Sequence, residues 1–433
     1  MGKDYYLSLG PGRRHRFSMP PKWVPVHFLE GEETDVGPSA GVMAAEALNK
    51  QVGAASSLRE RLSRARNIAV IVDDATRPTP VADILDVLLS ILIECGCSKD
   101  DITIVVALGT HVAMGREGLE TRLGKGVVSA YRIVQHDAWQ TDLVPVPLED
   151  GRVVRINPVI AASDVKIGVS SILPHPMAGY GGGPKLLMPG VCDIQFIMGH
   201  HMRHGIHPRS RVGQALGNPF HEDCMMIART IGLDLTIDCV YDRQGRIAGI
   251  VAGSLDEAFT EATAMCFEKL GHRFDEKVDV SITSSYPHTH GIQIYKGLAA
   301  PDIITRENGA ILLMAPMVTP VPDEFVRSFV KVKEASRGDA IAFVTAAMSK
   351  GLPFLPDHSA EFNMAMSYAI RRSRMRTVLV APMMSRNTAL TLGFEHAASL
   401  EQGLDVLKDA YPEARVAIFP TGGLIVPIAD WEQ

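Results

Sequence analysis

Short, almost uninterrupted apolar runs recur along the chain, and polar turns and amphipathic helical stretches separate them. Such runs are typical of strands that are buried on both faces, as in parallel sheets. They occupy residues 68–72, 102–108, 165–169, 278–282, 310–314, 377–380 and 416–419. Helices are expected between them, notably over residues 80–95 and 360–374. The alternation predicts an α/β fold with mainly parallel sheets.

The polar stretch over residues 271–277 interrupts this alternation, which then starts again. It predicts two α/β domains, an N-terminal one over residues 1–272 and a C-terminal one over residues 273–433. Ligands bind at the carboxyl ends of the strands in open α/β sheets. The active site is therefore expected in the cleft between the domains. Whether the last segment packs back on the first domain stays open.

Composition narrows the class of protein. Of 433 residues, 46% are hydrophobic and 21% are charged, and the formal net charge is −6. These are ordinary values for a globular protein, and without a basic run there is no reason to expect a nucleic-acid partner. No apolar run is long enough to span a bilayer. Six scattered cysteines favour reduced thiols, so we expect a cytoplasmic protein that binds neither nucleic acid nor membrane.

The stretch from His175 to His207 is the most unusual in the chain, because it crowds glycines, one lysine and five histidines together. The glycines at positions 179, 181, 182 and 183 let the backbone adopt positive φ and approach a ligand closely. Lys185 ends this run and can reach a bound group. A P-loop is excluded, since that motif needs Gly-Lys-Ser/Thr and here Pro184 precedes and Leu186 follows the lysine.

A helix is expected after this loop, with Asp193 as its N-cap. Ile194, Ile197, Met198 and His201 fall at i, i+3, i+4 and i+7, so His201 shares the buried apolar face. A single histidine on an apolar face is most often a satisfied core residue. Beside a glycine-rich lysine loop, His201 is also a candidate metal ligand.

His200 and His204 share a different face of that helix and, together with His207, form an alternative zinc site. The glutamate that follows the first histidine in zinc peptidases is absent, which weakens a hydrolase interpretation.

Polar residues follow several predicted strands at the point where each strand ends: Asp74, Arg77, His111, His175, His288, His290, Gln293 and Lys296. Arg77 offers a planar fork for a carboxylate or phosphate, and Lys296 offers a point charge. His111 and His175 are candidate general acid/bases. Two bases on opposite sides of one carbon are what a racemase or epimerase needs. For each residue the simpler alternative is a cap, a core residue or a surface ion pair.

These residues stand in motifs that resemble a known family, the nickel-pincer-dependent lactate racemases and related 2-hydroxyacid racemases and epimerases. The resemblance rests on Asp74-Ala-Thr-Arg77-Pro, on Gly-Thr-His111, on His175 through Lys185 with Pro189-Gly190 and His201, and on Gln293-Ile-Tyr-Lys296-Gly. The order and spacing of these motifs cover nearly the whole chain. The central segment is the most specific part.

The resemblance implies a cofactor and roles for the site residues. Lys185 would carry a nickel-pincer nucleotide (pyridinium-3-thioamide-5-thiocarboxylic acid mononucleotide) covalently, and His201 would be the protein ligand to its nickel. His111 and His175 would be the catalytic bases. Arg77, Gln293 and Lys296 would bind substrate, with Asp74 as their partner. The implied reaction inverts C2 of a 2-hydroxy acid by proton-coupled hydride transfer, and separate biosynthetic enzymes would supply the cofactor.

The chain departs from the family pattern at three positions: Gly181 replaces the usual serine, Pro184 replaces a small residue, and Val112 replaces an arginine. These changes bear on the support of the cofactor and on the shape of the pocket, and therefore on which substrate is bound. His288 and His290 are candidates for recognising further hydroxyls or carboxylates on a substrate larger than lactate. A zinc hydrolase and a non-catalytic carboxylate-binding protein remain the alternatives, and the oligomeric state stays open.

Overall fold

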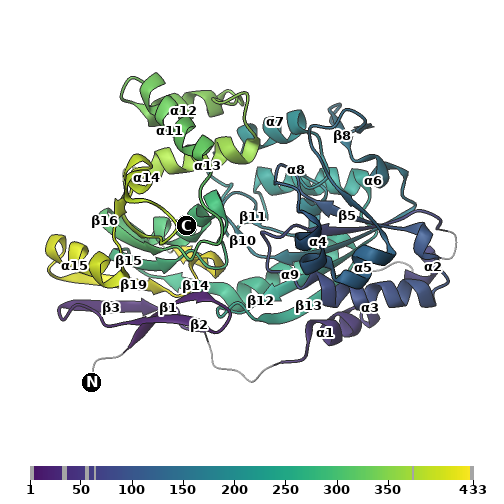
Figure 1. Ribbon diagram of the computed structural model, residues 1–433, viewed down its shortest axis with the longest axis horizontal. Coiled ribbons are helices and arrows are strands. Elements are labelled where there is room, and N and C mark those ends of the chain that lie inside the picture. Colours follow the sequence, from purple (N-terminus) through teal and green to yellow (C-terminus); the bar gives the residue numbers. More distant parts are fainter. Residues whose placement is uncertain (1–3, 32–36, 54–57, 63–64, 373–374, 430–433) are drawn as a thin grey trace.

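The computed structural model describes residues 4–31, 37–53, 58–62, 65–372 and 375–429. Two six-stranded sheets lie side by side along the long axis of the molecule (Figure 1). Both are mainly parallel, which confirms the predicted α/β class. Residues 373–374 of the expected helix over 360–374 lie outside the described part of the chain.

The first sheet has the order β13-β12-β9-β4-β5-β6, and only β13 runs antiparallel to its neighbour. Its strands are β4 (Ile68–Asp73), β5 (Ile102–Ala107), β6 (Arg132–Gln135), β9 (Val165–Ile172), β12 (Leu235–Tyr241) and β13 (Ile247–Gly253). All residues of β4 are buried, as a continuous apolar run predicts.

The second sheet has the order β18-β17-β16-β15-β19-β3, and every pairing in it is parallel. Its strands are β3 (Trp23–Phe28), β15 (Val278–Ser284), β16 (Thr305–Met314), β17 (Arg376–Val380), β18 (Glu395–His396) and β19 (Ala414–Phe419). The seven strands predicted from apolar runs are thus all present, three in the first sheet and four in the second.

Four two-stranded pairs accompany the sheets: β1 (Tyr5–Gly10) with β2 (Arg13–Phe17), β7 (Val144–Pro147) with β8 (Val153–Ile156), β10 (Pro174–His175) with β11 (Gly179–Tyr180), and β14 (Gly271–Phe274) with β20 (Val426–Ala429). The last pair is parallel and joins the predicted junction to the end of the described chain.

Helices cover the sheets and bridge the two halves. They are α1 (Ala40–Asn49), α2 (Leu58–Leu62), α3 (Val81–Glu94), α4 (Arg116–Leu123), α5 (Lys125–Ala130), α6 (Pro158–Ala162), α7 (Ile194–His204), α8 (Pro219–Ile231), α9 (Leu255–Leu270), α10 (Ala299–Ile304), α11 (Asp323–Ala335), α12 (Ala340–Ser349), α13 (Ala360–Arg372), α14 (Arg386–Thr391) and α15 (Leu400–Ala410). Short 3-10 helices are η1 (Lys99–Asp101), η2 (Gly183–Leu186), η3 (Gly291–Leu298) and η4 (Gly422–Leu424). Among the described residues, none of the helices is both long and apolar enough to cross a membrane.

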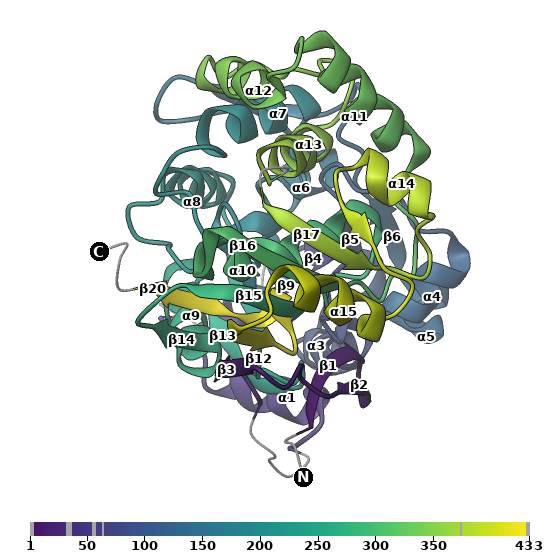
Figure 2. The same cartoon turned by 90° about the vertical axis from the view of Figure 1, so that its left-hand side faces the viewer.

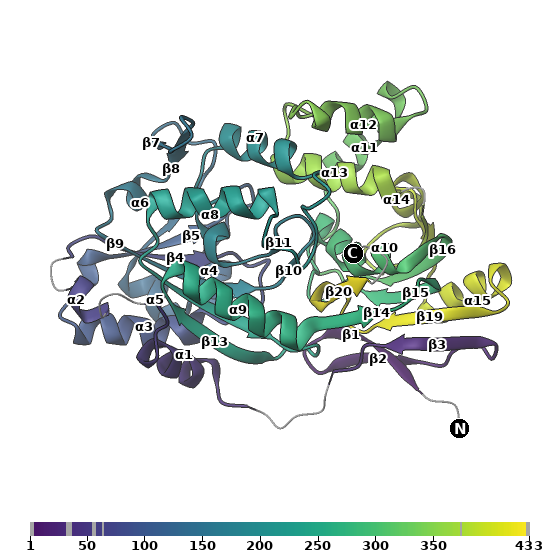
Figure 3. The ribbon, with the colours of Figure 1, turned by 180° about the vertical axis from the view of Figure 1, so that it is seen from behind.

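Two bridges link the halves. Figure 3 shows α9 lying against the first sheet and leading directly into β14 beside the second. Figure 2 shows α11, α12 and α13 gathered at one end of the second sheet, where α13 packs against α7 of the first half. The chain therefore crosses between the halves on one side and closes over them on the other.

The N-terminal strand β3 pairs with β19, so residues 23–28 complete the second sheet although they precede the first. The indole of Trp23 is only 4% exposed, and its N–H donates to the carbonyl of Tyr411 at 2.7 Å. The domain boundary near residue 272 stays a proposal. Any such division must assign β3 to the second sheet.

We expect the Trp23→Ala variant to lose about 3–5 kcal/mol of unfolding free energy, because it empties a buried aromatic site and removes a hydrogen bond. Val24 on the same strand is 56% exposed, and Val24→Ala should cost less than about 1 kcal/mol. Urea titration of both variants measures the difference. Equal losses would show that β3 does not contribute a packed strand to the second sheet.

Candidate active site

A cavity of about 440 Å³ receives side chains from both halves of the molecule. It is lined by all eight residues to which the family resemblance assigns a role: Asp74, Arg77, His111, His175, Lys185, His201, Gln293 and Lys296. His288 also lines it, whereas His290 is not among the lining residues described. The sequence motifs, which are spread over more than two hundred residues, therefore meet in one place.

Parallel pairing explains why they meet. β4 ends at Asp73, β5 ends at Ala107 and β9 ends at Ile172, and the three strands are neighbours in one sheet. The carboxyl ends of parallel strands emerge at the same edge. The loops that follow these strands carry the N-terminal site residues, and the loop and 3-10 helix after β15 supply those of the second sheet.

His111 and Asp74 form a hydrogen-bonded pair across two of these loops. The His111 Nδ1 lies 2.7 Å from the Asp74 Oδ2, and Asp74 Oδ1 accepts from the Thr76 backbone N–H at 2.6 Å. Burial alone would raise the pKa of Asp74, but His111 and Arg77 outweigh it, so this pKa lies well below its usual range. An ionised Asp74 orients the imidazole as a donor at Nδ1, which leaves Nε2 with the lone pair.

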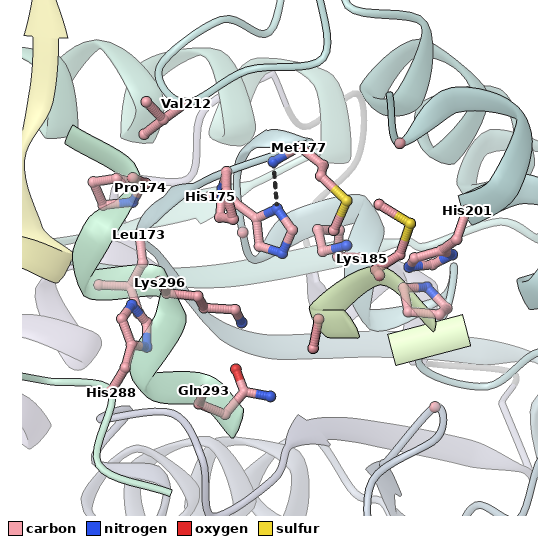
Figure 4. Close-up of a pocket in the computed structure, with 18 of the residues that line it drawn as sticks. Leu173, Pro174, His175, Met177, Lys185, His201, Val212, His288, Gln293 and Lys296 are labelled. Atoms are coloured by element: carbon pink, nitrogen blue, oxygen red, sulfur yellow. Dashed lines mark hydrogen bonds between the residues drawn. The ribbon is translucent and has the colours of Figure 1, made fainter. Parts of the chain in front are cut away.

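His175 is held by backbone groups instead. Its Nδ1 accepts from the N–H of Met177 at 3.3 Å and of Ala178 at 3.1 Å (Figure 4). Burial, together with the charges of Lys185, Lys296 and other neighbours, lowers the pKa of His175 well below its usual value. The ring is neutral near neutral pH. Because Nδ1 is an acceptor, the ring proton resides on Nε2.

The glycine-rich loop presents Lys185 to the cavity. Gly182 and Gly183 have φ values of 74° and 51°, and a Cβ on Gly182 would lie 2.5 Å from the Ser171 carbonyl. The N–H of Gly183 points to Ser170 Oγ at 3.0 Å and to Asp238 Oδ1 at 3.3 Å. This close packing requires glycine and fixes the first turn of η2, from which Lys185 extends.

Lys185 has an unusual amine. Its Nζ lies 4.9 Å from the centre of the Phe220 ring. Burial, with a contribution from Arg77, lowers its pKa to about 8 although Cys224 acts in the opposite direction. The amine therefore loses its proton more readily than an ordinary lysine does, and its unprotonated form is a nucleophile.

His201 is oriented as a ligand. Asp193 caps α7 as predicted by accepting from the Phe196 N–H at 2.9 Å. The His201 Nδ1 lies 2.9 Å from the Ile197 carbonyl oxygen, to which it donates. Metal-bound histidines commonly fix the second ring nitrogen in this way. The lone pair is then on Nε2, so His201 is suited to bind a metal.

The alternative zinc set is not assembled as expected. Among the described residues, His200 and His204 approach Asp223, not His207. His207 is exposed, because α7 ends at His204 and the chain then turns. His200 is 2% exposed, since the Phe220 ring on α8 covers that face of the helix.

Asp223, which His200 and His204 approach, is already paired with an arginine. The guanidinium of Arg152 donates to both of its carboxylate oxygens. These hydrogen bonds and the neighbouring histidine lower the pKa of Asp223 despite its burial. An ion pair already compensates the charge that a cation would need.

One supporting residue is missing from the sequence-based candidates. Asp238 is fully buried in β12, where its carboxylate binds Ser170, the Thr236 hydroxyl and the loop that carries Lys185. Burial raises its pKa. A single acid inside the apolar run Leu-Thr-Ile-Asp-Cys-Val-Tyr was the signal that could have identified it.

Comparisons with known proteins support the family resemblance found in the sequence. Residues 13–213 match the family model of the lactate racemase N-terminal domain. The lactate racemases of Lactiplantibacillus plantarum and Thermoanaerobacterium thermosaccharolyticum are 31% and 27% identical to the chain over 276 and 275 residues. Each match covers 62% of this chain and 64% of the relative, slightly less than two thirds of its length.

Two solved structures share the fold. The lactate racemase apoprotein from Thermoanaerobacterium thermosaccharolyticum superposes with a TM-score of 0.85 at 20% identity, over 98% of this chain and 100% of the other. A protein from Thermotoga maritima has a TM-score of 0.66 at 15% identity, over 92% and 100% of the two chains. The two-sheet arrangement is therefore common to these proteins.

The lowered pKa of Lys185 can be tested by competitive acetylation with limiting acetic anhydride. In unloaded protein the labelling rate at Lys185 should rise through a midpoint near pH 8, with the exposed Lys22 as internal reference. Arg77→Leu should move the midpoint upwards, because a nearby cation that disfavours protonation is removed. Mass spectrometry of the peptides gives both values. A midpoint near the ordinary lysine pKa of about 10.4 would contradict the assignment.

Proposed function

We propose that the chain belongs to the lactate racemase family, whose N-terminal domain model matches residues 13–213, and that it is an isomerase that inverts C2 of a 2-hydroxy acid. The observation that carries this proposal is the meeting of two histidines from separate strand ends with two cationic side chains in one cavity. Each histidine is held by a different partner, so each can act from its own side of a bound carbon.

The two histidines differ in what they offer a substrate. His111 donates to Asp74 and keeps a lone pair on Nε2, which makes it the acceptor of the substrate hydroxyl proton. His175 carries its proton on Nε2 and so begins as a hydrogen-bond donor. An acceptor and a donor of this kind suit a reaction in which the hydroxyl oxygen on C2 gives its proton to one histidine and, once the configuration at C2 is inverted, receives a proton from the other.

The substrate carboxylate is assigned to the cationic side chains. The Arg77 guanidinium can bind both carboxylate oxygens, and the Lys296 ammonium adds a point charge. Gln293 contributes an amide beside them on η3. Together these groups would hold the acid so that its hydroxyl faces the histidines.

Lys185 and His201 are assigned to the nickel-pincer nucleotide. The nucleophilic amine of Lys185 suits a covalent link, and the Nδ1 anchor of His201 suits ligation through Nε2. When bound, this cofactor would accept the α-hydrogen as hydride and return it. Enzymes of cofactor biosynthesis are the expected partners, and six free cysteines suit a cytoplasmic location.

Two alternatives predict different observations. A zinc hydrolase would use His200 and His204, which approach Asp223 and thus form a group able to hold a metal. A carboxylate-binding protein without catalysis would need only the cationic groups. Neither alternative requires an accessible, nucleophilic Lys185 beside an anchored His201.

Protein purified from its native host should carry added mass on Lys185 and stoichiometric nickel. His201→Ala should lose the nickel, whereas His204→Ala should retain it, because His204 belongs to the Arg152–Asp223 ion-pair group. Intact-mass and peptide mass spectrometry, with metal analysis of the same samples, provide the readout. Stoichiometric zinc that is lost from His204→Ala, with an unmodified Lys185, would favour the hydrolase.

The loaded enzyme should racemise a 2-hydroxy acid in D₂O without incorporating deuterium at C2, since the α-hydrogen returns as hydride. His111→Gln and His175→Gln should each lower kcat by about 10²–10⁴-fold, as expected for loss of a general acid/base. Chiral chromatography and NMR of the product measure rate and labelling. Full deuteration at C2 would indicate proton abstraction and overturn the hydride route.

A further inference from the structure

His288 is a buried imidazole whose ring has no hydrogen-bond partner among the residues that the structure describes. It follows β15 and is 4% exposed, and it lines the cavity. Its Nε2 is buried without a partner, and neither ring nitrogen makes a hydrogen bond to any residue that the structure describes. A buried polar group left without a partner costs stability, so such groups in native proteins call for an explanation.

The other histidines predicted for the site differ in this respect. His111 is bound to Asp74, His175 to two backbone N–H groups and His201 to the Ile197 carbonyl. In each of them one ring nitrogen is fixed by the protein and the other serves the site. In His288 the buried Nε2 lies against Gly423 and has no partner among the described residues, whereas Nδ1 is the ring nitrogen left for a group bound in the cavity.

The ring of His288 is nonetheless held in a defined position. Its backbone N–H donates to the Ser285 carbonyl at 2.8 Å, and the Ser285 hydroxyl donates back to the His288 carbonyl at 2.9 Å. The ring packs against Gly423, where a Cβ would lie 2.6 Å from its Cδ2 and 2.9 Å from its Nε2. The imidazole is therefore preorganised without any hydrogen bond of its own.

The surroundings determine what this ring can bind. Burial, and then the charges of Lys296 and Arg77, lowers the pKa of His288 well below its usual value, so the ring is neutral. Cations nearby attract oxygen atoms that carry negative charge or lone pairs. A neutral imidazole beside them binds such an oxygen by donating its N–H. Figure 4 shows His288, Lys296 and Gln293 on one side of the cavity and Lys185 and His201 on the opposite side.

We propose that His288 forms a subsite for an acceptor oxygen carried beyond C2 of the substrate, next to the Lys296 ammonium that helps to bind the C1 carboxylate. The inference rests on the proposed function, in which Arg77 and its neighbours bind the C1 carboxylate. The substrate is then a 2-hydroxy acid whose side chain bears a hydroxyl or a carboxylate, rather than lactate. A methyl group at this position would leave His288 unsatisfied, and a site built for a polar group discriminates strongly against analogues that lack it.

Binding to the unloaded protein tests the subsite independently of turnover. Isothermal titration calorimetry compares glycerate and malate with lactate and with 2-hydroxybutyrate, which matches glycerate in size but lacks its terminal oxygen. At least one oxygenated acid should bind about tenfold more tightly than 2-hydroxybutyrate. Preference for glycerate identifies a hydroxyl as the group bound, and preference for malate identifies a carboxylate. Equal or tighter binding of 2-hydroxybutyrate, or no binding of any of the four acids, overturns the proposal.

Three variants assign the preference to this ring. His288→Leu should abolish it by removing the donor, and Gly423→Ala should weaken it by displacing the ring while the donor remains. His290→Asn is the matched control, since His290 lies in the same loop but is not among the lining residues, and it should retain the preference. Thermal melts verify that each variant is folded. An unchanged preference in His288→Leu overturns the proposal.

Failure of the subsite and failure of the proposed function give different results. If host-purified enzyme racemises lactate as efficiently as the oxygenated acids, and His288→Leu leaves the ratio of their kcat/KM values unchanged, the protein is a racemase and the subsite is wrong. If the oxygenated acids bind preferentially through His288 but none of the four is racemised, the subsite stands and the racemase assignment fails.

Discussion

The site depends on the parallel pairing of β4 with β5 on one side and with β9 on the other. In this register Asp73 pairs with Ala107, and Val72 pairs with Val169. The loops after the three strands therefore leave the sheet at nearly the same level. A shift of register by one residue would turn every buried side chain of β4 to the opposite face. The packing of the strand in this register thus also sets the positions of the loops that carry the candidate site residues.

A buried polar network next to the cavity also fixes the position of the glycine-rich loop. Asp238 on β12 binds Ser170 on β9 and the N–H of Gly183, so two neighbouring strands hold the turn that precedes Lys185. Next to it, Arg122 is paired with Asp73 and also donates to the carbonyls of Arg77 and Thr79. These hydrogen bonds satisfy buried backbone groups next to the cavity. They therefore make the loops that line it more rigid.

Much of this could be predicted from sequence because it depends on local pattern. Continuous apolar runs identified seven strands, and the strand-end rule together with family-like motifs identified eight side chains that do line one cavity. Long-range pairing carries no such local signal. β3 lies beside β19 because of tertiary contacts, and no feature of residues 23–28 alone indicates which sheet they join. The roles of the eight residues stay predictions.

Errors in the sequence-based interpretation have the same origin. The face of α7 that carries His200 was expected to differ from the buried one, but Phe220 from another helix covers it. His288 and His290 could not be told apart from their spacing, and only their packing shows that His288 lines the cavity. Asp238 was overlooked because its function depends on a tertiary contact. Its carboxylate accepts from the N–H of Gly183, in the loop that carries Lys185.

The charges in the cavity link attachment at Lys185 to the acid/base chemistry of His175. After burial, the Lys185 ammonium is the largest influence that lowers the pKa of His175. Conversion of this amine to a thioamide, as the proposed cofactor link requires, removes the charge. The pKa of His175 would then be less depressed, although burial, which is the larger cause, would remain. Under the proposed function, loading of the cofactor would thus bring the second histidine nearer to the range in which an imidazole exchanges protons near neutral pH, whereas in the unloaded protein it is held neutral.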